Sequence, residues 1–231
     1  MKLLGIDTSA KCASAAVCTE DKIIISGTIH TNLTHSQTLL PLVKDLLKAA
    51  EIQLEDIDAY AVSKGPGSFT GIRIGVSAVK GFATAKNKEC FGVSTLEALA
   101  YNLIGFDGII CPLMDARCKQ VYNALFEIRN EKPERFCDDR AVSIEDLTNE
   151  LKAFDKKIIL VGDGAELCYE SMKNEIKVIE LAPLTLRYQL ASSVCAAAFG
   201  KPPCTAEELV PSYLRLSQAE RERKAKLSKE E

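Results

Sequence analysis

The sequence predicts an α/β fold with mixed sheets flanked by helices, on three observations. Short β-favouring runs alternate with longer segments whose apolar residues recur at helical spacing, an order typical of α/β proteins. The first three β-favouring runs follow one another directly as a β-meander, whereas helices separate the later ones, so mixed sheets are expected. With 231 residues and 47% hydrophobic content, the chain can bury a core as one large or two small domains.

The first half of the chain gives clear signals for individual elements. Glu20 and Asp21 form a tight turn between the second and third strands, and Thr34 is a candidate cap for the first helix. Ser94 and Glu97 have the spacing of a capping box for the third helix. We expect strands at residues 2–8, 13–19, 22–29, 59–63 and 88–93, and helices at residues 34–50, 69–86 and 95–103.

The run Gly105-Phe-Asp-Gly108 is the best candidate for a domain boundary. We expect strands at residues 109–114, 120–128, 157–161 and 176–181, a long hairpin or surface loop at residues 129–140, and helices at residues 143–154, 165–173 and 185–199. Residues 1–106 are then an N-terminal lobe, residues 107–210 a smaller C-terminal lobe, and residues 211–231 a charged C-terminal segment. The alternating charges after residue 217 favour a solvated helix or a frayed tail.

Charge and cysteine content limit the classes of function. Lys plus Arg number 29 against 32 Asp plus Glu, and a net charge of -3 is the wrong sign for a chain that holds nucleic acid unaided. Any RNA is therefore expected to be held mainly by a partner. The nine cysteines include no Cys-x-x-Cys pair, which favours reduced thiols in a cytoplasmic protein. No signal peptide or membrane span is expected.

Glycines are unusually frequent from Gly65 to Gly81. A glycine inside a helix costs about 1 kcal/mol relative to alanine, so Gly71, Gly75 and Gly81 indicate that something approaches the backbone closely, and we expect another helix. A plain tight turn at Gly65-Pro66-Gly67 remains an equal interpretation. A phosphate-binding loop is disfavoured because neither the P-loop nor the Gly-x-Gly-x-x-Gly spacing is present.

The segment of residues 34–50 has apolar side chains over about half its circumference, more than the roughly 100° stripe of a one-sided surface helix. We therefore expect it to have two neighbours, the core and a partner, with the glycine-containing helix beside it. The expected partner-binding residues are Leu39, Leu42, Val43, Leu46, Gly71, Ile74, Gly75 and Ala78. Arg73 and Lys80 are expected to face solvent.

Few residues suggest chemistry. Asp7, Thr8 and Ser9 follow the first strand, where they could hold a metal or phosphate, although satisfying turn amides is the commoner role. His30 and His35 are the only histidines and have no acids clustered beside them, so neither a metal site nor catalytic residues are predicted.

Four segments together resemble the bacterial TsaB family, and the resemblance covers nearly the whole chain. They are Gly5-Ile-Asp-Thr-Ser9, Thr34-His-Ser-Gln-Thr-Leu-Leu-Pro41, Lys64-Gly-Pro-Gly-Ser-Phe-Thr-Gly-Ile-Arg-Ile-Gly75 and Val93-Ser-Thr-Leu-Glu-Ala-Leu99. The resemblance implies the two-lobed fold of actin, Hsp70 and sugar kinases. It also implies a non-catalytic scaffold that binds TsaD, with TsaE joining, while TsaD transfers threonylcarbamoyl from its AMP adduct to adenosine beside the anticodon of tRNA.

Relatives of the TsaD type carry two metal-binding histidines where this chain has Thr95 and Leu99, so the resemblance implies no metal site here. Residues 7–9 and 162–165 resemble degenerate phosphate and adenosine motifs, and no cofactor or ATP hydrolysis is expected. The chain is thus expected not to be an enzyme by itself. Two alternatives stay open, a degenerate metallopeptidase-like or kinase-like enzyme and an independent homodimeric binding module.

Overall fold

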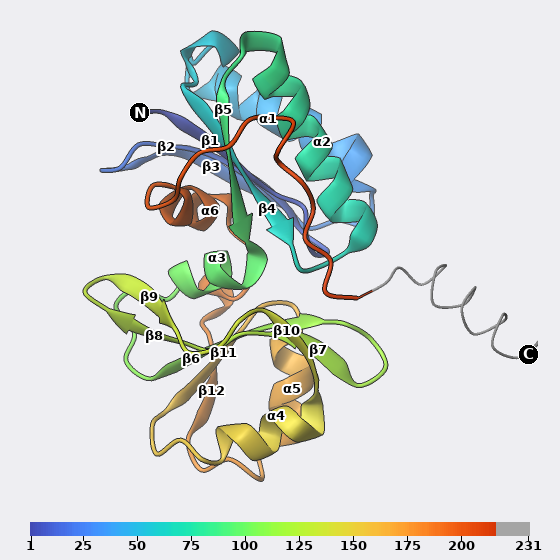
Figure 1. Ribbon diagram of the computed structural model, residues 1–231, viewed down its shortest axis with the longest axis vertical. Coiled ribbons are helices and arrows are strands. Elements are labelled where there is room, and N and C mark those ends of the chain that lie inside the picture. The colour runs from blue at the N-terminus through green and yellow to red at the C-terminus, as the bar shows by residue number, and fades with distance from the viewer. Residues whose placement is uncertain (216–231) are drawn as a thin grey trace, which may run out of the picture.

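Two sheets, one above the other in Figure 1, organise residues 1–215, the part of the chain that the computed structural model describes. The first sheet has the strand order β3-β2-β1-β4-β5. Its antiparallel side pairs β1 with β2 and β2 with β3, and its parallel side pairs β1 with β4 and β4 with β5, so the sheet is mixed as predicted. Its strands are β1 (Leu3–Asp7), β2 (Ala13–Cys18), β3 (Ile23–Ile29), β4 (Ala59–Gly65) and β5 (Glu89–Ser94).

Helices cover both faces of this sheet. On one face lie α1 (His35–Ala49) and α2 (Phe69–Lys86), which cover an apolar cluster that includes the fully buried Tyr60. On the other lie α3 (Thr95–Tyr101) and α6 (Ala191–Ala198), packed on the alternate side chains of the same strands. Because both faces are covered, β1 and β2 are buried at every position, which explains their continuous runs of apolar and small residues.

The second sheet has the order β10-β7-β6-β11-β12, with β8 pairing β6 and β9 pairing β8. Two helices, α4 (Ile144–Leu151) and α5 (Ala165–Met172), pack on one face. The other face meets α3 through Leu96 and Leu99, so α3 joins the two lobes. The strands are β6 (Ile109–Asp115), β7 (Gln120–Asn123), β8 (Phe126–Arg129), β9 (Lys132–Arg135), β10 (Arg140–Ser143), β11 (Ile158–Val161) and β12 (Ile179–Leu181).

Three predicted elements were wrong in extent, one of them the strand expected at residues 176–181, which forms only as β12 (Ile179–Leu181). The strand expected at residues 120–128 is broken between β7 and β8, where buried Asn123 donates its Nδ2 to the carbonyls of Pro112 (3.1 Å) and Ala124 (3.0 Å). The helix expected at residues 185–199 begins only at α6. Asn102 Nδ2 donates to the carbonyls of Leu186 and Tyr188, both at 2.8 Å, and these bonds hold the preceding segment in an extended path.

The chain returns to the first lobe after the second sheet. Helix α6 packs against β1 and β2, and the C-terminal strap, residues 201–215, continues along the first lobe beside β5 and α2 (red in Figure 1). Cys90 and Cys204 exchange backbone hydrogen bonds of 2.8 Å, and Leu209 is buried in the α1–α2 core. The expected assignment of all of residues 107–210 to a second lobe therefore differs from the observed packing, because α6 completes the first. Most of the charged segment, residues 216–231, lies outside the described residues.

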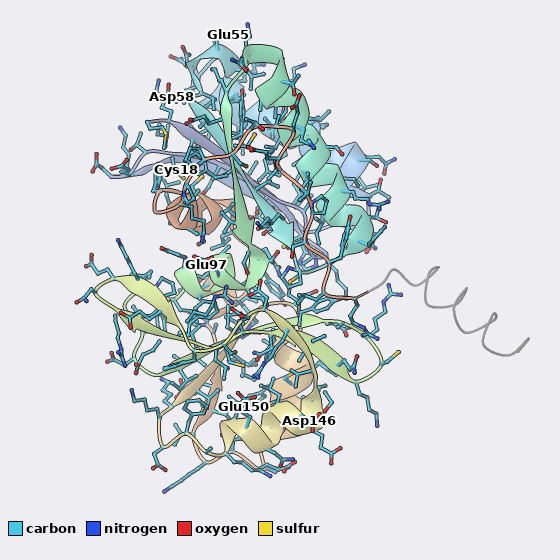
Figure 2. All side chains as sticks on the ribbon, viewed as in Figure 1. Cys18, Glu55, Asp58, Glu97, Asp146 and Glu150 are labelled. Atoms are coloured by element: carbon cyan, nitrogen blue, oxygen red, sulfur yellow. The ribbon has the colours of Figure 1, made fainter. Side chains whose placement is uncertain are left out.

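The junction of the two lobes also carries an ion pair. Glu97 of α3, labelled in Figure 2 where the lobes meet, lies 2.9 Å from the ammonium of Lys201. Ser94 Oγ caps α3 by accepting a hydrogen bond of 3.3 Å from the Glu97 amide, which is one half of the predicted capping box, whereas the Glu97 carboxylate pairs with Lys201. None of the helices within residues 1–215 combines the length and the hydropathy required to cross a membrane.

The glycines of α2 accommodate a strand rather than another helix. A Cβ at Gly71 would lie 2.1 Å from the Thr8 carbonyl oxygen, and one at Gly75 would lie 2.4 Å from Thr8 Oγ1. A Cβ at Gly81 would meet nothing within 4 Å. The prediction of a close approach holds for Gly71 and Gly75, but the neighbour is the end of β1 in the same chain, which corrects the expectation that they form a partner surface.

Substituting these glycines one at a time tests this packing. Gly71→Ala should lower the free energy of unfolding by about 1–3 kcal/mol, because the new methyl group meets a backbone atom. Gly81→Ala is the matched control and should raise it by about 1 kcal/mol through helix propensity. Urea unfolding measures both. Equal effects of the two variants would contradict the assigned packing.

Candidate functional site

A groove of about 780 Å³ runs between α1 and α2 on the outer face of the first lobe. Its most exposed large apolar side chain is Leu40, at 53% exposure. The lining is mainly apolar, and Arg73 is the one Lys, Arg, Asp or Glu among its described residues. The lining residues are His35, Ser36, Leu39, Leu40, Phe69, Thr70, Arg73, Ile74, Ser77, Ala78, Gly81 and Phe82.

The structure separates the expected partner-binding residues into two groups. Leu39, Ile74 and Ala78 line the groove. The other five residues do not line the groove. Four of them are buried inside the chain, namely Leu42, Val43, Gly71 and Gly75, and Leu46 is half-buried. Their burial corrects the expectation that they form surface contacts.

The cause of this error is the second neighbour of α1, which is not a partner chain. The helix packs on both β2 and β3, and Leu42 and Leu46 lie over Gly27 of β3. The wide apolar stripe therefore covers a twisted antiparallel pair of strands. Sequence reasoning missed Leu40 and Phe82 as groove residues, although both are apolar and at helical spacing from residues that it did select.

The C-terminal strap packs against Phe69 and Arg73 of the groove. The rings of Phe69 and Tyr213 stack with centroids 4.5 Å apart, and the guanidinium of Arg73 lies 3.9 Å from the Phe69 centroid. Arg73 Nε donates to the Tyr213 hydroxyl at 2.9 Å, and Lys80 Nζ donates to the Glu207 carbonyl at 3.4 Å. Arg73 is exposed as expected, yet both cations hold the strap as well as facing solvent.

The strap also bridges a cleft between the lobes, a cavity of about 480 Å³. The Ser212 amide donates to the Lys64 carbonyl of the first lobe at 2.7 Å. Arg215 Nη1 donates to the Ala116 carbonyl of the second lobe at 2.8 Å. The last described residues therefore tie the two lobes together across the mouth of this cleft.

Residues 7–9, which resemble a degenerate phosphate motif, are bonded to their own chain, and Ser9 lines the cleft. Asp7 Oδ1 accepts from the Ser9 amide (2.8 Å) and the Ser9 hydroxyl (2.7 Å), and Asp7 Oδ2 accepts from the Ser63 hydroxyl. Thr8 Oγ1 donates to the Gly71 carbonyl at 2.7 Å. Burial raises the pKa of Asp7, while the hydrogen bonds from Ser63 and Ser9 lower it in part. Asp7 was expected either to hold a metal or phosphate or to satisfy the polar groups of its own turn. These contacts correspond to the second role.

The two histidines make contacts within their own chain. His35 Nε2 lies 2.7 Å from the Ala10 carbonyl oxygen, and the ring of His30 meets Tyr188 edge-on at 5.6 Å. Thr95 and Leu99 are buried in α3. Across residues 1–215, no three His, Cys, Asp or Glu side chains come together in an arrangement that could hold a metal ion.

Asp163 lies in residues 162–165, the stretch that resembles a degenerate adenosine motif, but it was not among the predicted site residues. It follows β11 and lines the cleft, and its Oδ1 is buried with no hydrogen-bond partner among the described residues. Burial, with the charge of Asp115, raises the pKa of Asp163 from an ordinary 3.8 to about 6, while Lys11 opposes the shift. A strand that ends in Gly162-Asp163-Gly164 marks this position in the sequence, but the unpaired oxygen depends on the tertiary structure.

The charge of Asp163 should destabilise the folded chain at neutral pH. Since its folded pKa is raised, the folded state keeps the proton between pH 3.8 and about 6, and stability falls as the pH rises through that window. Asp163→Asn should therefore raise the melting temperature at pH 7.5 but not at pH 3.5, as measured by circular dichroism. Asp21→Asn, at an exposed turn, is the control. If the melting temperatures of Asp163→Asn and the wild type differed by the same amount at both pH values, the charge of Asp163 would not be the cause.

Comparison with known proteins places the chain among tRNA-modification proteins. Residues 29–221 match the family model described as TsaD, tRNA N6-adenosine threonylcarbamoyltransferase. A Bacillus subtilis (strain 168) protein described as tRNA threonylcarbamoyladenosine biosynthesis protein TsaB is 33% identical over 222 residues, 95% of this chain and 96% of that protein.

Solved structures support the same placement. A Pseudomonas aeruginosa protein described as similar to peptidase YEAZ is 27% identical, with a TM-score of 0.79 over 93% of this chain and 99% of that one. Component A of (R)-2-hydroxyglutaryl-CoA dehydratase from Acidaminococcus fermentans is 10% identical, with a TM-score of 0.51 over 86% and 97% of the two chains, and shares the fold alone. The predicted α/β fold with mixed sheets flanked by helices is thereby confirmed.

Proposed function

Because this chain belongs to the TsaB family, we propose that it takes part in the biosynthesis of threonylcarbamoyladenosine in tRNA as a scaffold that binds TsaD. TsaE joins the complex, and tRNA is held through the partners. The net charge of -3 supports indirect contact with tRNA, since unaided phosphate binding needs a positive surface. The nine free thiols support a reducing, cytoplasmic location.

The observation that carries the scaffold proposal is the α1–α2 groove. It combines a mainly apolar lining with a protruding Leu40 and an open stretch at Gly81, where a partner backbone could come close. Apolar grooves rimmed by polar side chains are typical of protein-binding surfaces. The Phe69–Arg73–Tyr213 stack fixes one end of the groove, so the surface is largely preformed.

The similarity of this chain to the TsaD family supports TsaD as the partner. Residues 29–221 match the TsaD model itself, and this range contains both groove helices. A TsaD chain with the same helix pair can present a similar groove, and two such pairs can pack together as a four-helix bundle. The same geometry would permit a homodimer when TsaD is absent, and the two uses of one surface exclude each other.

The chain is proposed to have no active site of its own. Thr95 and Leu99, at the positions of the TsaD histidines, are buried in α3 and offer no ligand to the cleft. Asp7, the acidic residue of the phosphate-loop position, has both carboxylate oxygens bonded to Ser9 and Ser63. Catalytic groups for threonylcarbamoyl transfer are therefore assigned to TsaD.

A matched pair of leucine variants tests the docking surface. Leu40→Asp places a charge in the groove and should weaken binding to TsaD at least tenfold, which is about 1.4 kcal/mol. Leu167→Asp changes an equally prominent leucine on α5, at 47% exposure, and should bind like the wild type. Isothermal titration with purified TsaD measures both, and melting temperatures confirm folding. If Leu40→Asp bound TsaD with the affinity of the wild type, the proposal that TsaD binds in the groove would be contradicted.

The biological role has a separate test. Depletion of this protein from its own cells should lower the content of threonylcarbamoyladenosine in bulk tRNA, as measured by mass spectrometry of digested nucleosides. Expression of the wild type should restore the content, and Leu40→Asp should not. A normal content after depletion would contradict the role in tRNA modification, whatever the chain binds.

A further inference from the structure

We propose that a small polar cavity between the lobes binds a small zwitterion such as a free α-amino acid. The cavity is separate from the α1–α2 groove and has a volume of about 140 Å³. A cavity of this size has room for several water molecules, and therefore for a ligand of a few non-hydrogen atoms. It is lined by Lys11, Cys12, His30, Asp163, Glu166, Tyr188 and Gln189.

Two buried polar atoms without partners lie on residues of this one cavity. Gln189 is 1% exposed, and its Nε2 has no hydrogen-bond acceptor among residues 1–215. Asp163 Oδ1 lacks a donor in the same part of the chain. A buried polar group without a partner costs about 1–3 kcal/mol. One ligand that offers both an acceptor for Gln189 Nε2 and a donor for Asp163 Oδ1 would therefore satisfy both atoms.

The neighbouring side chains keep the Gln189 amide in position. The Cys12 thiol donates to Gln189 Oε1 at a sulfur–oxygen distance of 3.5 Å. Burial and the charges of Asp7 and Asp163 raise the pKa of Cys12 to about 12, so it remains a thiol donor at neutral pH. With its oxygen engaged, Gln189 is left with its NH₂ group as a donor.

The charges of the cavity match a zwitterion. Glu166 is already engaged, because its Oε1 accepts from Arg187 Nη1 at 2.6 Å and from the Tyr188 hydroxyl at 3.4 Å. Asp163 remains as the carboxylate for an ammonium group, and Lys11, which forms no ion pair within the described residues, supplies the cation for a carboxylate. The Gln189 NH₂ adds a donor for the same carboxylate.

Ligand titrations on the full chain test the assignment, with saturation-transfer NMR at pH 7.5 as the measurement. The probes are glycine, L-serine and L-threonine, and acetate and methylamine each supply only one of the two charges. Glycine or a larger amino acid should bind saturably and at least tenfold more tightly than acetate or methylamine. Asp163→Asn and Lys11→Met should weaken amino-acid binding at least tenfold, and Lys22→Met, at an exposed lysine in the β2–β3 turn, should not.

The outcomes are decisive in both directions. Saturable binding that is lost in Asp163→Asn, and that weakens as the pH falls below about 6 and Asp163 takes a proton, supports the site. No saturable binding of any of the three amino acids, equal binding by Asp163→Asn, or stronger binding of acetate alone overturns it. Melting temperatures show whether each variant is folded. TsaD binding by the same variants should be unchanged, so failure of this site leaves the scaffold proposal intact.

Discussion

The contact between the end of β1 and the first turns of α2 determines how the first lobe is built. The Thr8 carbonyl and hydroxyl occupy the space that side chains at positions 71 and 75 would need. The Ser68 amide donates to the Ser9 carbonyl at 2.7 Å, so the turn before α2 is fixed to the turn after β1. With one side of α2 held this close to the sheet, its opposite side, with Ile74 and Ala78, faces outward. The groove exists because the inner side is so closely packed.

Sequence patterns predicted the elements of this lobe well, because each signal was local. The strand runs, the Ser94 cap and the glycine positions in α2 all reflect contacts within a few residues or a single buried face. The identity of the neighbour could not be read in the same way. A glycine in a helix indicates that a Cβ has no room, and a wide apolar stripe indicates burial. Neither pattern indicates whether the neighbouring atoms belong to the same chain or to a partner. Thr8 in one case and the strand β3 in the other were therefore mistaken for a partner.

The strap shows a second limit of sequence reasoning. Its contacts are single residues far apart in the chain, such as Cys204 with Cys90 and Tyr213 with Phe69. No periodic pattern precedes such contacts, and the run of residues 201–215 has no helix or strand spacing of its own. The stretch 162–165 was noted in the sequence, but the role of Asp163 could not be predicted, since an unpaired carboxylate oxygen is a property of the assembled cleft and not of the strand that ends beside it.

The two lobes therefore place aspartates with different surroundings at the cleft. On the side of the first lobe, the carboxylate of Asp7 is bonded to hydroxyls and an amide of its own turn, and it holds β1, β4 and the following loop in place. On the side of the second lobe, Asp163 has an oxygen without such bonds and a pKa near 6, so its charge is costly in the folded chain. A fold keeps a buried charge that is only partly compensated at a cost to stability, and such groups concentrate at functional sites. Asp163 and its neighbours are thus the part of the cleft where a ligand would gain most from binding.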